Sequence, residues 1–382
     1  MKVGIPKESS SGETRVAIIP AGAATLTKAG LQVVVESGAG LAAGFTDAAY
    51  AAQNATIASR AETLASDIIL QVRAIPPANG LHAGQTVIGF ADPLGSPQAV
   101  RDVAASGAAI LSMELMPRIT RAQSMDALSS MATIAGYKGV LLAANQLPRM
   151  FPMLMTAAGT VSPARVFIVG AGVAGLQAIS AARRLGAKVE AYDVRPAVKE
   201  QVQSLGARFV ELPLESADAE DKGGYAKELG EDFYRKQREL MAKQVAESDV
   251  VITTAAIPGK KSPVLITGDM LKGMPPGSVV VDLAAERGGN VDVTRAGETI
   301  EVHGVTVIGP LNIPSAVPYH SSQMYARNVM AFVQNFVAKG EINLSLEDEI
   351  NRDTMVAKDG EVVGARVREA LGMSKPAAAA TA

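Results

Sequence analysis

Residues 166–175 read VFIVGAGVAG, and this stretch decides the fold of the chain around it. Four apolar residues typical of a buried strand run directly into three glycines spaced G-x-G-x-x-G, and a helical pattern follows. In such a unit Gly170 permits the tight turn, Gly172 lets the backbone approach a pyrophosphate, and Gly175 lets helix and strand pack closely. The helix N-terminus, at Val173 and Ala174, would face the phosphates with its positive end. The stretch therefore predicts a dinucleotide-binding site.

An acidic residue follows at the distance that such a site needs. Asp193 closes the apolar stretch 188–192 and lies 18 residues after Gly175. A carboxylate there can accept hydrogen bonds from an adenosine ribose and would repel a 2′-phosphate, which favours NAD over NADP. The same glycine spacing also occurs in turns that bind nothing, but strand, helix and acid together favour nucleotide binding.

The composition excludes several classes of function. Thirty-six basic and 38 acidic residues give a net charge of −2, so no general basic field attracts nucleic acid or an anionic membrane. The chain has no cysteine, which excludes disulfides, thiolate catalysis and cysteine metal sites. Its three histidines are not spaced as metal ligands, and we expect no metal. Without a signal peptide or a run of roughly 18 to 20 apolar residues, we expect a soluble chain.

The length and the order of apolar runs predict two α/β domains, because 382 residues are long for one core. Apolar runs alternate with helix-compatible segments before the glycine turn, at residues 2–5, 31–35, 67–72, 86–90 and 109–113. The alternation continues at residues 166–169, 189–192, 208–212, 250–254, 279–283 and 305–308. This rhythm is typical of mostly parallel sheets, and six strands with helical crossovers make a doubly wound nucleotide domain.

We expect the first domain to be discontinuous, because helix-compatible segments at residues 129–145 and 322–337 flank the nucleotide domain. The predicted domains are residues 1–128 with 321–382, a first α/β domain, and residues 129–320, an NAD-binding Rossmann domain. Two Rossmann-like, doubly wound domains would leave a cleft between them, where ligands preferentially bind.

Residues 215–239 depart from the strand–helix rhythm, because they are dense in both signs of charge and contain Gly223, Gly224 and Tyr225. One interpretation is a solvated insertion that runs into an exposed helix. The other is a mobile loop, hinged at the glycines, that carries Tyr225 over the cofactor.

Residues 118–130, RITRAQSMDALSS, concentrate polar groups that few cores or turns need. Arg118 can pair with a pyrophosphate or a carboxylate, while Gln123 and Asp126 can fix the carboxamide and ribose of a nicotinamide, with a hydroxyl from Ser129. The other interpretation is an exposed loop before a helix whose N-cap is Ser124 or Asp126. Spacing alone leaves both open.

These residues carry a resemblance to a known family. The run PRITRAQSMDALSS at 117–130, with AGY at 135–137, is similar to a loop of the NAD(H)-binding alpha subunit (alpha1, domain I) of proton-translocating nicotinamide nucleotide transhydrogenase. Similar motifs span almost the whole chain: PKE at 6–8, GETRVA at 12–17, TAAGT at 156–160, VGAGVAGLQAI from 169, GGYAKE from 223, VITTAAIPGK at 251–260 and VDLAAERGGN at 281–290.

The resemblance implies a set of site residues. Asp193 would contact the adenosine ribose, Tyr225 would be the tip of the mobile loop, and Thr254 and Ala255 would join the glycine turn in contacting the cofactor. The nicotinamide-side contacts would be Arg118, Gln123, Asp126 and Ser129, of which the first three orient the dihydronicotinamide for catalysis.

Alanine dehydrogenase is the alternative within the same fold. The chain resembles that enzyme at Arg15, its substrate-carboxylate contact, but it has Arg73, Phe90 and Glu286 where the enzyme needs a Lys, a His and an Asp. Amino-acid oxidation needs proton transfers beside the hydride, and a guanidinium cannot replace the lysine because it stays protonated. A non-catalytic NADH-binding protein is a third hypothesis.

Hydride transfer between two nicotinamides moves no proton in the chemical step, so a site rich in positioning groups and poor in histidine can perform it. The resemblance implies that NADP(H) is bound by a partner subunit, that membrane-embedded subunits conduct protons, and that the chain is a homodimer. It also implies a cytoplasmic chain, peripheral on the inner side of the cell membrane through those subunits.

Overall fold

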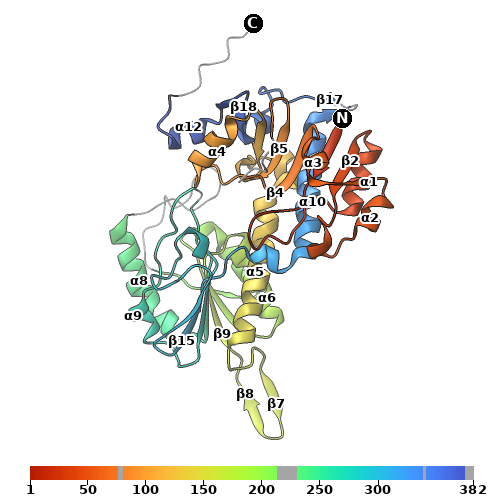
Figure 1. The fold of residues 1–382 in the computed structure, drawn as a ribbon. Coiled ribbons are helices and arrows are strands. Elements are labelled where there is room, and N and C mark those ends of the chain that lie inside the picture. Colours follow the sequence, from red (N-terminus) through yellow and green to blue (C-terminus); the bar gives the residue numbers. More distant parts are fainter. Residues whose placement is uncertain (76–80, 213–229, 258, 339–340, 375–382) are drawn as a thin grey trace. The chain divides into compact units, whose positions relative to one another are not determined.

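The computed structural model describes residues 1–75, 81–212, 230–257, 259–338 and 341–374. The chain divides into two compact units: unit 1 comprises Met1–Met131 and Ser315–Ala382, and unit 2 comprises Ala132–Pro314. The boundaries predicted from the sequence are 128/129 and 320/321. Each unit is built on a largely parallel sheet (Figure 1), so the predicted fold class of two Rossmann-like domains is confirmed.

Unit 1 contains an eight-stranded sheet in the order β19-β18-β6-β5-β4-β1-β2-β3. Its strands are β1 (Lys2–Ile5), β2 (Gln32–Glu36), β3 (Thr56–Ala58), β4 (Ile68–Arg73), β5 (Thr86–Phe90), β6 (Ala109–Ser112), β18 (Met355–Lys358) and β19 (Glu361–Val362). The first six are parallel, while β18 pairs antiparallel with β6 and β19 pairs antiparallel with β18. The C-terminal segment thus completes the sheet of unit 1.

Both faces of this sheet are covered, because successive side chains of a strand point to opposite faces. On β4, Ile68 and Leu70 join one hydrophobic cluster while Ile69 joins another. The helices of unit 1 are α1 (Pro20–Lys28), α2 (Asp47–Ala51), α3 (Arg60–Leu64), α4 (Pro97–Ala104), α10 (Pro318–Phe336), α11 (Glu349–Thr354) and α12 (Ala365–Ala370). The first cluster includes side chains of α1 and α10, and the second includes side chains of α4 and α12.

Unit 2 contains a seven-stranded sheet in the order β11-β10-β9-β12-β13-β15-β14. Its strands are β9 (Arg165–Val169), β10 (Lys188–Tyr192), β11 (Arg208–Phe209), β12 (Val250–Thr253), β13 (Val279–Asp282), β14 (Thr299–Val302) and β15 (Val305–Ile308). All pair in parallel except β14, an antiparallel edge strand. The strand order reverses between β9 and β12, and in open sheets of this type ligands bind beyond the carboxyl ends of the strands at such a point.

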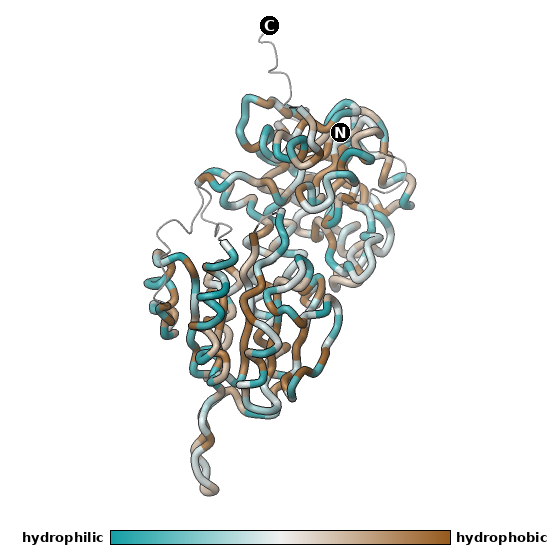
Figure 2. The backbone as a smooth tube through the Cα atoms, turned by 90° about the vertical axis from the view of Figure 1, so that its left-hand side faces the viewer, coloured by the Kyte–Doolittle hydropathy of each residue, from teal (hydrophilic) through white to brown (hydrophobic). Residues whose placement is uncertain are grey.

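The sheet of unit 2 is hydrophobic on both faces. On β9, Val166 and Ile168 pack with side chains of α5 (Ala127–Gln146), α6 (Val173–Arg184) and α7 (Lys199–Ser204), while Phe167 and Val169 pack with α8 (Glu231–Ala246) and α9 (Gly268–Leu271). Figure 2 shows these strands as hydrophobic segments inside the unit, with more hydrophilic segments outside them.

Helix α5 (Ala127–Gln146) contains the boundary between the units, at Met131 and Ala132. Within the described residues it is the one helix long and apolar enough to cross a membrane by length and composition. A core helix meets the same test, and α5 contributes Ala127 and Met131 to the core of unit 1 and Val140 and Ala143 to that of unit 2.

A two-stranded hairpin, β7 (Leu154–Thr156) and β8 (Gly159–Val161), projects from unit 2 (Figure 1). A second small pair, β16 (Val337–Ala338) and β17 (Glu341–Ile342), follows α10 in unit 1.

Candidate functional site

The glycine turn joins β9 to α6, and its three glycines meet different constraints. Gly170 has φ +97°, and a Cβ there would lie 2.6 Å from Thr254 Oγ1. A Cβ on Gly175 would lie 1.8 Å from the carbonyl oxygen of Gly170, so this glycine permits the close packing of helix on strand. A Cβ on Gly172 would meet no atom within 4 Å. The backbone at Gly172 is therefore open to a ligand.

The carboxylate of Asp193, directly after β10, is held beside this turn. It is buried, and its Oδ2 accepts a hydrogen bond of 2.7 Å from the backbone N–H of Ala171. Arg195 donates its backbone N–H and its Nε to Oδ1, both at 2.9 Å, and its Nη2 to Oδ2 at 2.9 Å. Arg195 is not among the residues predicted from the sequence, although it lies two residues beyond the predicted ribose contact.

Thr254 and Ala255 follow β12 and contact the turn from the neighbouring strand. Thr254 donates its hydroxyl to the carbonyl oxygen of Gly170 at 3.0 Å. Ala255 is fixed by Asn290, whose Oδ1 accepts the Ala255 N–H at 3.0 Å and whose Nδ2 donates to the Ala255 carbonyl at 2.9 Å. Asn290 also donates to the carbonyl oxygen of Pro263 at 2.8 Å, and it is fully buried.

Asn290 is in turn held by the buried carboxylate of Asp282, the last residue of β13. Asp282 Oδ2 accepts the backbone N–H groups of Asn290 and Val291 and the hydroxyl of Thr294, at 2.7 to 3.0 Å. Its Oδ1 accepts the Thr253 hydroxyl at 2.9 Å and the Ala284 N–H at 3.1 Å. This network is not predicted from the sequence. The sequence feature that could have indicated it is Asp282 itself, an acidic residue at the end of an apolar strand, as Asp193 is.

The loop expected to hold the nicotinamide lies in unit 1, as a 3-10 segment, Thr120–Met125, followed by α5. Asp126 accepts the backbone N–H of Ser129 at 2.9 Å and its hydroxyl at 2.5 Å, so Asp126 caps α5. Arg118 and Gln123 are exposed. The helix cap expected under the alternative interpretation of this loop is thus present. It also joins Asp126 and Ser129, two of the four predicted nicotinamide contacts, to each other.

Contacts from the C-terminal part of unit 1 hold this loop in place. Arg121 donates to both carboxylate oxygens of Asp348, at 2.7 and 3.1 Å, and to Asn335 Oδ1 at 3.1 Å. The guanidinium keeps the pKa of Asp348 below its ordinary value. Asn328 on α10 donates to the carbonyl oxygen of Ser124 at 2.8 Å. The loop is therefore anchored at Arg121 and Ser124.

The predicted site residues thus form two groups. Unit 2 brings together Gly170, Gly172, Val173, Ala174, Gly175, Asp193, Thr254 and Ala255, and unit 1 brings together Arg118, Gln123, Asp126 and Ser129. Tyr225 lies outside the described residues, as does most of the segment 215–239. Its last residues, 231–239, form the beginning of α8.

Comparisons with known proteins place this arrangement in a family. Residues 4–135 match the N-terminal domain of the alanine dehydrogenase/PNT family, and residues 139–365 match its C-terminal domain. The chain belongs to the alanine dehydrogenase/PNT family. It is 46% identical to an NAD(P) transhydrogenase alpha subunit of Rhodospirillum rubrum, over 95% of this chain and 98% of the relative. Alanine dehydrogenase of Halomonas elongata is 31% identical, over 98% of this chain and 97% of the relative.

A solved transhydrogenase structure from Sinorhizobium meliloti matches with a TM-score of 0.85 and 45% identity, covering 95% of this chain and 100% of that one. The resemblance to the transhydrogenase alpha subunit is therefore confirmed, and alanine dehydrogenases are more distant members of the same family.

Three of the residues compared above with functional groups of alanine dehydrogenase, Arg15, Arg73 and Phe90, contact other side chains of unit 1. Arg15 is buried and pairs with Glu13 (Nη2 to Oε2, 2.6 Å), and Arg73 also contacts Glu13 (Nε to Oε2, 3.3 Å). Burial alone would raise the pKa of Glu13, but the hydrogen bonds and charge of Arg15 outweigh it and lower that pKa to about 2. Phe90 packs against the ring of Tyr325, with centroids 5.2 Å apart.

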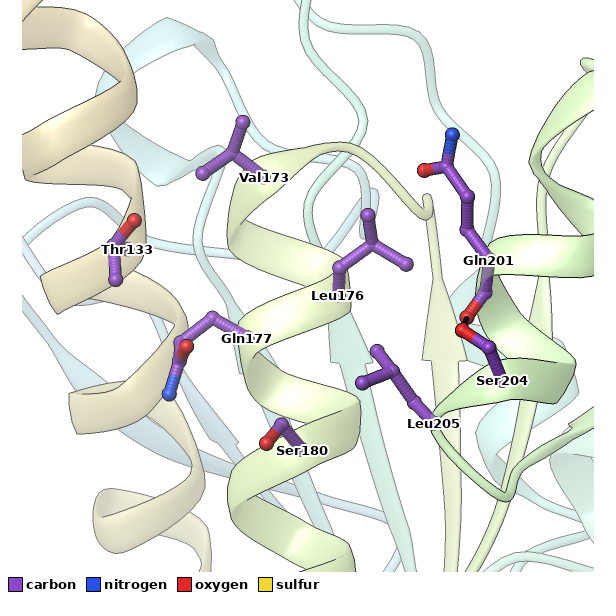
Figure 3. Close-up of a pocket in the computed structure, with 8 residues that line it drawn as sticks. All are labelled: Thr133, Val173, Leu176, Gln177, Ser180, Gln201, Ser204 and Leu205. Atoms are coloured by element: carbon purple, nitrogen blue, oxygen red, sulfur yellow. Dashed lines mark hydrogen bonds between the residues drawn. The ribbon is translucent and has the colours of Figure 1, made fainter.

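A pocket of about 410 Å³ lies on the flank of α6 in unit 2, between α5 and α7 (Figure 3). Thr133 faces it from α5, Gln177 and Ser180 from α6, and Gln201 from α7. All eight residues that line it are uncharged. Because a dinucleotide carries phosphates, the glycine turn with Asp193 fits that ligand better than this pocket does.

Proposed function

We propose that the chain is the NAD(H)-binding subunit of a proton-translocating transhydrogenase. In this role it presents NADH for direct hydride transfer to NADP⁺ on a partner subunit, coupled to proton translocation across a membrane. The observation that carries the proposal is the 46% identity to a transhydrogenase subunit over nearly the full length of both chains.

The residues of unit 2 fit NAD(H). Gly172 leaves open backbone at the N-terminus of α6, where partial positive charge favours a pyrophosphate. Asp193 lies against the same turn through Ala171, where it could accept hydrogen bonds from the ribose next to that pyrophosphate. Thr254 and Ala255, fixed by Gly170 and Asn290, would border the cofactor from β12. When bound, NADH supplies the hydride.

The nicotinamide end would be oriented by Arg118, Gln123, Asp126 and Ser129 of unit 1. Arg118 and Gln123 are exposed, while Asp126 and Ser129 hold each other at the start of α5. None of these groups has to act as an acid or a base, because hydride transfer between two nicotinamides moves no proton. Their contribution would be positioning, which can be worth several kcal/mol.

Alanine dehydrogenase activity fits the chain less well. Arg15, which would contact a substrate carboxylate, is buried and paired with Glu13. At the lysine and histidine positions of that enzyme stand Arg73 and the buried Phe90, which cannot transfer protons at neutral pH. We propose no amino-acid substrate, and a non-catalytic NADH-binding role remains the other alternative.

The proposed partners are membrane-embedded transhydrogenase subunits that include an NADP(H)-binding domain. The relatives are named as alpha subunits, which implies an assembly of several chains. We further propose a homodimer, located in the cytoplasm at the inner side of the cell membrane through those subunits.

The decisive experiment measures NADH-dependent reduction of an NADP analogue by the purified chain, with and without the NADP(H)-binding partner domain. We expect hydride transfer only in the mixture, and no NAD reduction by alanine. Reduction of NAD by alanine with the chain alone would overturn the proposal. NADH binding with neither activity would favour the non-catalytic alternative.

Conservative variants separate orientation from binding. Gln123→Asn and Asp126→Asn should slow hydride transfer much more than they weaken NADH binding, and Asn at 126 still caps α5. Gln98→Asn, an exposed amide on α4, is the matched control and should change neither quantity. Equal losses in rate and affinity would reduce Gln123 and Asp126 to binding contacts. Replacement of Tyr225 by alanine tests whether the segment 215–239 acts as a loop over the cofactor. Unchanged NADH affinity and hydride-transfer rate would favour the interpretation as a solvated insertion.

A further inference from the structure

The carboxylate of Asp193 already accepts as many hydrogen bonds as it can. Oδ1 receives two donors from Arg195, its backbone N–H and its Nε, and Oδ2 receives the Ala171 N–H and Arg195 Nη2. A carboxylate offers about four lone-pair sites in total. A ribose hydroxyl can therefore bind Asp193 only if the guanidinium of Arg195 gives up part of its contact.

We propose that Arg195 is a second determinant of nucleotide specificity. Asp193 restrains the guanidinium, and without that restraint Arg195 becomes a receptor for the 2′-phosphate of NADP(H). The inference rests on the proposed binding of NAD(H) at the glycine turn and deepens it.

The geometry of the pair supports this role. The side chains of Arg195 and Asp193 are only 14% and 6% exposed, so both charges are held largely out of water and each depends on the other. Because guanidinium and carboxylate touch at 2.9 Å through two parallel contacts, a ligand group that reaches Asp193 also reaches Arg195. The planar guanidinium fork matches phosphate as well as carboxylate.

The charge balance explains why the native chain would still reject NADP(H). With Asp193 present, a 2′-phosphate meets a carboxylate whose neighbouring cation is already paired. With a neutral residue at 193, Arg195 keeps its charge and loses its partner carboxylate. The nearby Lys199, at the start of α7, pairs with the exposed Glu211 instead and provides a comparison.

The experiment titrates NADH and NADPH fluorescence against the full chain in the native form, Asp193→Asn, Asp193→Asn/Arg195→Ala and Asp193→Asn/Lys199→Ala. We expect Asp193→Asn to weaken NADH binding about tenfold and to strengthen NADPH binding about tenfold to a hundredfold, the factor of one charge-assisted hydrogen bond. Adding Arg195→Ala should abolish the gain for NADPH, whereas adding Lys199→Ala should keep it. Arg195→Ala alone should produce no gain.

Equal NADPH affinity of Asp193→Asn with and without Arg195 would overturn the inference. Failure of the native chain to bind NADH would overturn the proposed function instead, so the two failures are distinguishable. Asn at 193 retains an acceptor for the Ala171 N–H, and thermal melting checks that the variant folds. If Asp193→Asn does not fold, Asp193→Ser is used in its place, alone and combined with Arg195→Ala or Lys199→Ala. The NADPH affinities of these variants are then compared in the same way.

Discussion

The second and third glycines of the turn, Gly172 and Gly175, have separable roles. A methyl group on Gly175 would overlap the Gly170 carbonyl at 1.8 Å, so Gly175→Ala should lower the free energy of unfolding by about 3 kcal/mol and weaken NADH binding. Gly172→Ala adds its methyl in open space, and we expect a stability change within about 0.5 kcal/mol. The same methyl would occupy the space of the pyrophosphate, so NADH affinity should fall at least about tenfold.

Thermal melting and NADH titration of the two glycine variants check this prediction together. An unchanged NADH affinity of a stable Gly172→Ala variant would contradict the assignment of the pyrophosphate to this turn. A Gly175→Ala variant as stable as the native chain would contradict the packing role of Gly175.

Glu8 gives unit 1 a pH-dependent stability. Burial raises the pKa of Glu8 to about 7, although the N–H groups of Val72 and Arg73 oppose the shift. For an acid whose pKa is raised on folding, its stabilising contribution is fully present below the unfolded pKa of 4.5. Above that pH the unfolded chain loses the proton first, so the contribution of Glu8 is lost as the pH rises through about 7. The loss should be on the order of 3 kcal/mol.

Glu8→Gln mimics the protonated acid and should remove most of this pH dependence. Denaturant unfolding between pH 4.5 and about 8 measures it. The exposed Glu361→Gln is the control and should leave the native dependence unchanged. If the Glu8→Gln variant kept the full native pH dependence of the free energy of unfolding, that dependence would come from other groups.

At the scale of elements, the segment after β12 is positioned by Asn290. In Asn290→Asp a carboxylate would face the carbonyl oxygens of Ala255 and Pro263, where the amide now donates. We expect NADH affinity to fall about tenfold at neutral pH, the effect of one lost hydrogen bond to Ala255, which is proposed to border the cofactor. Affinity should recover as the pH falls, because the protonated carboxyl group donates again.

Asn351→Asp is the matched control for this substitution. Asn351 is also buried and donates Nδ2 to two backbone carbonyls, those of Asn343 and Ser345, but it lies in unit 1. Both variants should lose stability, and only Asn290→Asp should lose NADH affinity. Equal NADH affinities of the two variants would leave Asn290 a structural residue.

The elements that the sequence predicted are those with strong local patterns. The strands β9, β10, β12, β13 and β15 are apolar because both faces of their sheet are covered. The missed β14 is an edge strand whose residues alternate in burial, and β18 and β19 are short antiparallel additions. Such strands depend on a neighbour far along the chain, which a local pattern does not reveal.

The same limit applies to the site. Gly170, Gly175 and Asp193 follow from spacing, because each serves a turn or lies at the end of a strand. Asn290 contacts Ala255, 35 residues away, and its role depends on how β12 and β13 pair. The sequence left Asp126 as either a nicotinamide contact or the N-cap of a helix. Its hydrogen bond from the Ser129 N–H shows the N-cap and does not test the nicotinamide contact.

At the scale of the whole molecule, the proposed homodimer has a candidate contact in the β7–β8 hairpin. An isolated two-stranded hairpin is marginally stable in water, yet this one exposes Met155 at 79% and Val161 at 42%. Exposed apolar side chains on a projecting element are typical of an interaction site. The expected occupant of that surface is a second copy of the chain.

Met155→Ser/Val161→Ser should therefore weaken the dimer. Two apolar side chains from each copy, each contributing about 1.5 kcal/mol, correspond to about 6 kcal/mol, or about a ten-thousandfold rise in the dimer dissociation constant. Sedimentation equilibrium over a range of concentrations measures this constant. Leu41→Ser, an apolar residue of unit 1 that is 58% exposed, is the control and should leave the dimer intact. Because the hairpin contains none of the predicted cofactor contacts, the double variant should bind NADH with native affinity, and an unchanged dimer would place the interface elsewhere.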